Sequence, residues 1–101
     1  MMLKTDYKDE VLTVHLSGEL DHNRAANLRA KIDGRVNALR PKTLELDFSK
    51  VSFMDSSGIG LIMGRYRSVG LVGGKLRVVN IPDNLTKIFA LSGISSLGVL
   101  K

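Results

Sequence analysis

Apolar and polar residues alternate in several short stretches of this 101-residue chain. The segments 3–7 and 11–16 flank the polar Lys8-Asp9-Glu10, a pattern that predicts the two strands of a hairpin. Over residues 43–48 every second residue is Leu or Phe, which predicts another strand with one buried face. Two later apolar stretches, 76–81 and 97–100, each have the length of one strand.

Between these strands the apolar residues recur every three to four positions, as on one face of a helix. The first such stripe consists of Ala25, Leu28, Ile32, Val36 and Leu39. Asp21 or Asn23 is the expected N-cap of this helix, and Pro41 ends it. The second stripe consists of Ile59, Ile62, Tyr66 and Val69. A third, shorter helix follows Pro82, carries Leu85, Ile88, Phe89 and Leu91, and closes at Gly93.

The predicted order of elements is therefore β-β-α-β-α-β-α-β. Strands that follow helices are usually parallel, so we expect an α/β fold with a mixed, mostly parallel sheet and helices packed against it. A chain of this length forms one core, and no linker or repeat interrupts it. Residues 1–101 are predicted to be a single domain.

The junction between the strand at 43–48 and the second helix carries Met54-Asp55-Ser56-Ser57-Gly58-Ile59-Gly60. The first N–H groups of a helix have no partners within the helix, and the helix dipole favours negative charge there. A phosphate carried on Ser56 would find donors and a favourable field at this position. Ser and Asp before an apolar helix are also frequent as plain N-caps, so both interpretations stay open from the residues alone.

The composition restricts the classes of function. The chain contains 44% hydrophobic and 25% charged residues, with no cysteine, which is ordinary for a globular protein and excludes disulfides and thiol chemistry. The net charge of +5 is spread along the chain, and only five aromatic residues are present, so direct binding of nucleic acid is not expected. The chain shows no signal peptide or membrane-spanning run, so we expect a cytoplasmic protein that makes no membrane contact.

Catalytic patterns are absent. The serines lack the glycine two places earlier that a nucleophile elbow requires, and only His15 and His22 could act as a base. His15 lies in mid-strand, where a structural histidine is the simpler interpretation, and the spacing of the His and acidic residues matches no metal site. Gly58-Ile59-Gly60 lacks the rest of any phosphate-binding loop. We predict a protein that is not an enzyme and holds no metal or cofactor.

Two motifs together, Gly18-Glu19-Leu20-Asp21-His22 and Phe53 to Gly60, resemble those of the anti-sigma factor antagonists of the STAS family. The segment 61–67 extends the similarity, especially toward the members that act in sporulation, and the similarity covers nearly the whole chain. Members commonly carry a further C-terminal helix after the last strand. The sequence stops at Lys101, so we expect that helix to be absent or removed.

The resemblance implies a binding protein that works by partner switching. In this family the unphosphorylated antagonist binds an anti-sigma factor and so releases a sigma factor for transcription. The anti-sigma factor is also an ATP-dependent serine kinase, which phosphorylates the antagonist, and a separate serine phosphatase reverses the modification. The serine directly after the motif aspartate is the target, which is Ser56 here. Asp21 matches the family's loop aspartate, which engages the kinase.

The same resemblance makes Asp55, Ser57, Gly58, Ile59 and Gly60 candidates for contact with the partner. Each also has a simpler structural interpretation. Ser57 is the expected helix cap, the glycines would allow close helix packing, and Ile59 fits the core stripe. Two other functions stay open: a STAS scaffold in a stress-signalling complex, and a STAS domain that binds a small ligand such as a nucleotide or lipid.

Overall fold

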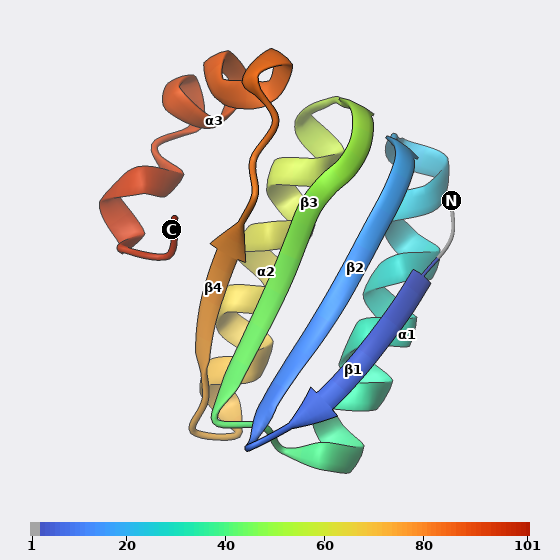
Figure 1. The fold of residues 1–101 in the computed structure, drawn as a ribbon, viewed down its shortest axis with the longest axis vertical. Coiled ribbons are helices and arrows are strands. Elements are labelled where there is room, and N and C mark those ends of the chain that lie inside the picture. The colour runs from blue at the N-terminus through green and yellow to red at the C-terminus, as the bar shows by residue number, and fades with distance from the viewer. Residues whose placement is uncertain (1–2) are drawn as a thin grey trace.

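A computed structural model describes residues 3–101 and shows one four-stranded sheet with two long helices on one face (Figure 1). The elements, in chain order, are β1 (Leu3–Lys8), β2 (Val11–Leu20), α1 (His22–Leu39), β3 (Thr43–Met54), α2 (Ser56–Leu71), β4 (Lys75–Val79) and α3 (Thr86–Ser92). Short 3-10 helices at Asp83–Leu85 and Ile94–Leu97 flank α3. The predicted order is confirmed as far as the third helix.

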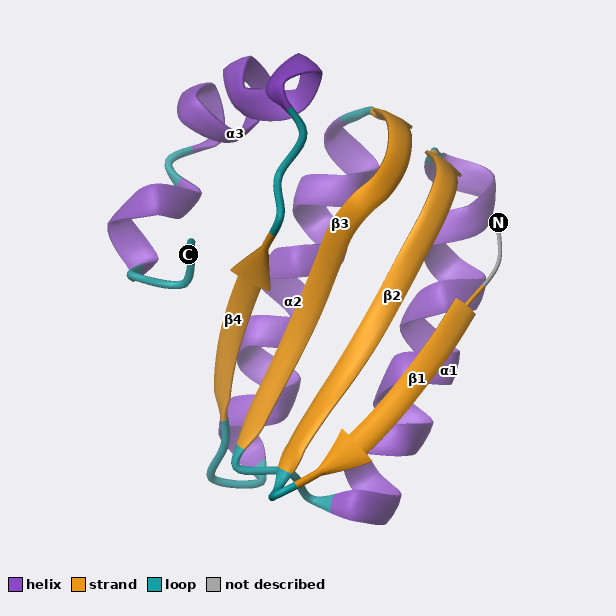
Figure 2. Ribbon diagram, in the orientation of Figure 1, coloured by secondary structure: helices purple, strands orange, loops and turns teal. Residues whose placement is uncertain are grey.

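The strands lie side by side in the order β1-β2-β3-β4. The hairpin makes β1 and β2 antiparallel, whereas the β2–β3 and β3–β4 pairs are parallel because a helix lies between their strands. Both crossover helices cover the same face, and the other face of the sheet is open (Figure 2). The mixed, mostly parallel sheet is confirmed.

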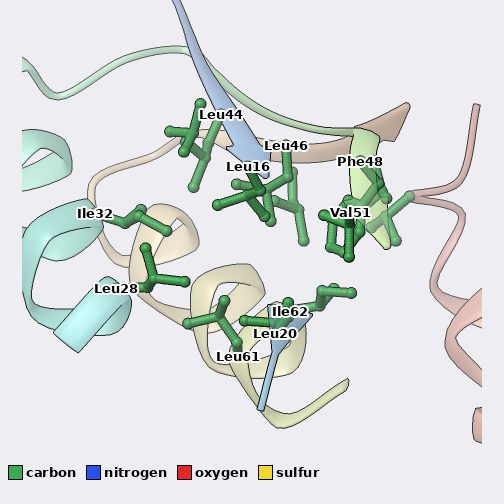
Figure 3. Close-up of a cluster of buried hydrophobic side chains, with 14 of the residues drawn as sticks. Leu16, Leu20, Leu28, Ile32, Leu44, Leu46, Phe48, Val51, Leu61 and Ile62 are labelled. Atoms are coloured by element: carbon green, nitrogen blue, oxygen red, sulfur yellow. The ribbon is translucent and has the colours of Figure 1, made fainter. Parts of the chain in front are cut away.

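The core lies between this sheet and the two long helices (Figure 3). Alternate residues of β3 point into it, among them Leu44, Leu46 and Phe48, as the period of two predicts. From α1 it receives Leu28 and Ile32, together with Val36 one turn later. The ring of Phe48 meets Phe89 of α3 edge to face, with 5.5 Å between centroids, so α3 is attached to the same core.

The prediction for the second helical stripe was wrong at one position. Tyr66 is exposed, and Arg65 takes the buried place between Ile62 and Val69. Its side chain is only 5% exposed, and its Nε lies 2.8 Å from Oδ1 of Asp33 on α1. An arginine therefore occupies an interior position because a carboxylate on the neighbouring helix compensates its charge.

The predicted strand over residues 97–100 was also wrong. Leu97 ends a 3-10 turn, and only Leu100 makes a bridge, parallel to Val78 of β4. Gly93 and Gly98 adopt positive φ angles of 77° and 71°, and each sets a turn. These turns prevent a longer extended segment, although Val99 is buried.

Candidate functional site

The junction between β3 and α2 is an elbow capped by Asp55. Its backbone is extended (φ −101°, ψ −170°), and its Oδ1 accepts a hydrogen bond from the amide of Ser57 at 2.8 Å. Its carbonyl oxygen accepts a second from the amide of Gly58 at 3.0 Å. The expectation that Ser57 caps the helix was wrong, because the aspartate before the serines performs this role.

Ser56 is the first residue of α2 and is exposed. Within residues 3–101 its hydroxyl makes no hydrogen bond, so capping does not occupy it. The hydroxyl lies in the first turn of a 16-residue helix, where the dipole is positive. An accessible, uncommitted hydroxyl in this position is a suitable acceptor for a phosphoryl group.

Asp21 also caps a helix, after the neighbouring strand β2. It is the N-cap of α1, and its Oδ1 accepts from the amide of Arg24 at 3.1 Å. Its Oδ2 also pairs with the Arg24 guanidinium at 2.8 Å. Asn23, the other predicted cap, lies inside the helix.

The sheet brings these two caps together. Leu20 and Met54, the last residues of β2 and β3, are register partners, and the amide of Asp55 donates to the carbonyl of Leu20 at 3.4 Å. The starts of α1 and α2 therefore lie at the same edge of the sheet, as Figure 1 shows. Two acidic caps, Asp21 and Asp55, flank this edge, and Ser56 is exposed beside them.

The two glycines of the elbow differ. Gly58 is buried, and a Cβ atom there would collide with Cγ and Sδ of Met54, so this glycine is required by packing. Gly60 is exposed, and a Cβ atom there would meet nothing within 4 Å. Ile59 is half buried against the core. No contact within the fold explains Gly60.

A groove that the sequence did not predict lies beside this elbow. It has a volume of about 340 Å³, and its lining is mainly apolar, with Phe53 on one side and Ile88 and Leu91 of α3 on the other. Phe53 is 49% exposed and Leu91 78% exposed. Phe53 points outward although it lies two residues after the buried Val51, because the β2–β3 register shifts between these positions. Its proximity to α3 also depends on the fold.

The two histidines lie apart from the elbow. His15 is on the open face of the sheet, where its Nδ1 lies 2.7 Å from Asp47 and its Nε2 lies 3.0 Å from Asp6. The hydrogen bond to Asp47 is the main cause that raises the pKa of His15. His22 is exposed in the first turn of α1. Among residues 3–101, neither histidine forms a hydrogen bond with Ser56 or Ser57 that would make it a general base for these hydroxyls.

Within residues 3–101, no three His, Asp or Glu side chains are arranged to hold a metal ion. Over the same part of the chain, none of the helices has both the length and the apolar character needed to cross a bilayer.

Comparison with known proteins identifies the family. The profile of the STAS domain matches residues 2–99. The anti-sigma F factor antagonist of Lysinibacillus sphaericus is 36% identical over 84% of this chain and 73% of its own length. The structure of the anti-sigma factor antagonist SpoIIAA in its unphosphorylated form is similar, with a TM-score of 0.85 and 32% identity over 99% of this chain and 86% of that chain. The phosphorylated form of the Bacillus cell fate determinant SpoIIAA matches with a TM-score of 0.76 and 32% identity over 99% of this chain and 89% of that chain.

Proposed function

Since the chain belongs to the STAS domain family, we propose that it is an anti-sigma factor antagonist controlled by phosphorylation of Ser56. In this proposal the unphosphorylated protein binds an anti-sigma factor that is also a serine kinase, and the bound sigma factor is released to activate transcription. The observation that carries the proposal is the exposed, unbonded hydroxyl of Ser56, which directly follows the acidic helix cap Asp55 at the edge of the sheet where the cap Asp21 also lies. The similarity to a phosphorylated antagonist supports it.

The contact surface that we propose is the edge of the sheet where both long helices begin. Asp21 and Asp55 supply negative charge there, and Ser57 and Ile59 add contacts in the first turn of α2. Gly60 allows the partner's backbone to approach closely, whereas Gly58 acts by keeping the helix against Met54. The apolar groove beside Phe53 extends the same surface.

The modification itself requires little from this chain. The Ser56 oxygen attacks the γ-phosphorus of ATP, the bond from that phosphorus to the β–γ bridging oxygen breaks, and ADP leaves. In this proposal the hydroxyl proton passes to a base that the kinase supplies. The rate of phosphoryl transfer then depends on how the kinase positions Ser56 against ATP and on the charges in the kinase's own active site.

Phosphorylation then releases the partner by local electrostatics. A phosphoserine carries about 1.5 to 2 negative charges at neutral pH, and it would stand beside the carboxylates of Asp21 and Asp55. The dipole at the start of α2 can stabilise this charge without rearrangement of the fold. A bound partner, by contrast, would meet the added negative charge at its interface. A loss of about 1.4 kcal/mol weakens binding tenfold. A serine phosphatase resets the switch, and we place the whole exchange in the cytoplasm, with a sporulation sigma factor as its target.

The decisive experiment mixes the protein with the kinase-type anti-sigma factor of the same genome, ATP and magnesium, and maps phosphate by mass spectrometry. We expect stoichiometric phosphate on Ser56, none on Ser56→Ala, and phosphate still located on Ser56 in Ser57→Ala. Calorimetry should show wild-type affinity for Ser56→Ala and at least about tenfold weaker binding for Ser56→Asp.

Each alternative result has a definite meaning. Phosphate on Ser57 would move the site and keep the mechanism. Equal affinities for the Ala and Asp variants of Ser56 would exclude charge as the signal. No phosphate despite an active kinase would refute the proposal and favour a scaffold or a ligand-binding domain.

A further inference from the structure

β1 is an edge strand of the sheet, and its outer side has no neighbouring strand within residues 3–101. The strand order is β1-β2-β3-β4, so β1 pairs with β2 alone. The end of the described chain bridges β4 through Leu100, at the other edge of the sheet from β1. An unpaired edge presents backbone N–H and C=O groups to which another strand can bond.

The hairpin turn determines which backbone groups of β1 point outward. The two residues of the loop 9–10 have φ angles of 52° and 65°, as in a type I′ turn. Lys8 and Val11 close this loop as a hydrogen-bonded pair, and such pairs alternate with non-bonded pairs along an antiparallel ladder. The backbone groups of Thr5 and Tyr7 therefore point away from β2, toward the free edge.

Two cations of α1 lie on the same side of the molecule as this edge. Asp33 of α1 faces α2, because it pairs with Arg65. Lys31 and Arg35 are each two positions from Asp33, which is about 200° around the helix, so they lie on the flank away from α2. Figure 1 shows α1 behind β1 and α2 behind β3 and β4, so this flank is on the side of the β1 edge.

These cations are available to a ligand. Lys31 and Arg35 are exposed, and neither forms an ion pair with any residue in 3–101. On the open face of the sheet Lys4 and Lys8 of β1 are also exposed, and no ion pair within the described chain occupies them. The acidic residue between these two lysines, Asp6, is already in an ion pair with β2. The unpaired charge along β1 and along this flank of α1 is therefore positive.

The spacing of the two α1 cations matches that of an extended chain. Residues four apart on a helix are separated by about 6 Å along its axis, and alternate residues of a strand are about 6.6 Å apart. Since α1 runs roughly along the strands, a strand added beside β1 would place two successive side chains of one face near Lys31 and Arg35 (Figure 1). Tyr7, the register partner of the buried Leu12, is 44% exposed on that face and offers the added strand a cross-strand neighbour.

We propose that the free edge of β1 binds an extended acidic segment of a partner protein, which adds to the sheet as a further strand. The backbone of this segment bonds to Thr5 and Tyr7, and its acidic side chains pair with Lys31 and Arg35 of α1. Lysines on an edge strand disfavour pairing with a second copy of this chain, because the copy would bring the same cations. The charges therefore favour an acidic strand over self-association.

The test uses a synthetic peptide in which glutamate alternates with threonine, a residue that favours strands. A matched peptide carries lysine at every glutamate position. Fluorescence anisotropy measures affinity, and amide hydrogen exchange maps the contact. We expect only the glutamate peptide to bind, with affinity that falls as salt rises and with new protection of the amides of Thr5 and Tyr7. Protection of the Asp6 amide, which faces β2, should not change.

Backbone bonding can be separated from attraction between charges. Two further peptides carry N-methyl groups, each at one of the two alternating sets of residues of the glutamate peptide. Only one set directs its N–H groups at β1, so we expect one of these peptides to bind at least about tenfold more weakly and the other to keep its affinity. On the protein, Thr5→Pro removes an outward N–H that an edge strand can spare and should weaken binding, whereas Thr5→Val keeps this N–H and should not.

Substitutions on the helices test the charges. Lys31→Gln with Arg35→Gln should weaken the glutamate peptide about fivefold. Arg29→Gln with Arg67→Gln makes the same change in net charge away from the β1 edge and should leave the affinity unchanged. Phosphorylation of Ser56 by the kinase should be normal in all of these variants, so failure here is distinguishable from failure of the proposed function.

Four results would overturn the inference. The first is absence of binding by the glutamate peptide, or equal binding by the lysine peptide. The second is equal affinity of the two N-methylated peptides. The third is a dimer of the protein alone, seen by analytical ultracentrifugation and lost in Thr5→Pro, which would make the edge an interface between copies of this chain. The fourth is binding of a single-stranded oligonucleotide, lost in Lys31→Gln with Arg35→Gln, in the absence of any peptide binding.

Discussion

His15 joins two strands through its imidazole ring. Its two nitrogens contact carboxylates of Asp6 on β1 and Asp47 on β3. Ionised carboxylates accept hydrogen bonds only, so both contacts form when both ring nitrogens carry protons. Hydrogen bonds from the Ser49 amide, Asn80 and His15 outweigh the effect of burial and lower the pKa of Asp47 to about 2.

These shifts predict how stability depends on pH. The pKa of His15 is raised in the folded state, so its contribution is complete below the ordinary value of 6.5 and is lost as pH rises through the folded value. Because the pKa of Asp47 is lowered, this group stabilises the folded state at pH values above 3.8, its ordinary pKa. That contribution to stability is lost as pH falls toward about 2. Urea unfolding should show greater stability at about pH 5.5 than at about pH 8.5.

His15→Gln should remove most of that difference in stability. We expect the difference to be about 1 kcal/mol or less, because His15 is partly exposed and Asp6 is mostly exposed. The matched control is His22→Gln, since His22 forms no ion pair with residues 3–101. An unchanged pH profile in His15→Gln would exclude the bridge as its cause.

Gly58 and Gly60 provide a matched pair of substitutions in one helical turn. Gly58→Ala should destabilise by about 1–3 kcal/mol, because the new methyl group collides with Met54 and lies 3.2 Å from Cδ2 of Leu20. Gly60→Ala should stabilise by about 0.5–1 kcal/mol, because alanine favours the helix and has free space. Thermal unfolding measures both effects.

The same pair tests the proposed contact with the anti-sigma factor. If the partner's backbone approaches Gly60, Gly60→Ala should bind more weakly even though the variant is more stable. Wild-type affinity would remove Gly60 from the contact surface. If Gly58→Ala loses binding while Gly60→Ala does not, the cause would be displacement of the start of α2 and not loss of a contact with the partner.

At the scale of elements, α1 and α2 are joined by the ion pair of Asp33 and Arg65. Burial lowers the pKa of Arg65, and the nearby Asp33 carboxylate opposes this effect. The N–H of Nε points at Ser68 Oγ, 3.3 Å away, so the contact with Asp33 is a charge pair rather than an aligned hydrogen bond. Nη1 has no hydrogen-bond partner among residues 3–101.

Removing one member of the Asp33–Arg65 pair should lower the free energy of unfolding more than replacing both members by apolar residues. Asp33→Ala leaves a buried charge without compensation and should destabilise by about 3 kcal/mol. Asp33→Leu combined with Arg65→Met should be neutral or stabilising, because the desolvation cost disappears with the charges. Arg67→Met, on the exposed side of α2, is the control and should change stability by less than about 0.5 kcal/mol. If the double variant is as unstable as Asp33→Ala, the ion pair is required for α1 and α2 to pack against each other.

At the scale of the whole molecule, the proposed phosphorylation site lies at one end of a layered fold with a single core. The starts of α1 and α2 are fixed by pairing of Leu20 with Met54, and the core beneath them is continuous. The helix dipole stabilises a phosphate at Ser56, whereas Asp21 and Asp55 repel it. These opposing effects should nearly cancel within the isolated protein.

Phosphorylation should therefore leave the fold almost unchanged. We expect the free energy of unfolding to shift by less than about 1 kcal/mol, with amide chemical shifts confined to residues near Asp21 and Ser56. Comparing spectra of the two forms checks this. Shifts that extend into β4 would indicate a change of conformation, and release of the partner would then need more than local charge.

Much of the fold was predictable because its signals are local. The period of two at Leu44, Leu46 and Phe48 identifies a strand with one buried face, and the spacing of Leu28 and Ile32 identifies a helix. The elbow could be located for the same reason, since the period changes at Asp55. Assigning the helix cap among three neighbouring polar residues needed the backbone geometry, which placed it on Asp55.

The sequence alone determined the order of elements, their buried faces and the exposed serine at the start of a helix. These features depend on neighbours within one or two turns, where side-chain period and capping decide the conformation. Only the tertiary structure decided that Arg65 lies inside, that residues 97–100 bridge rather than form a strand, and that Phe53 faces α3. It also made β1 an edge strand of the sheet. Such contacts join residues far apart in the chain, and they depend on how helices and strands pack in space.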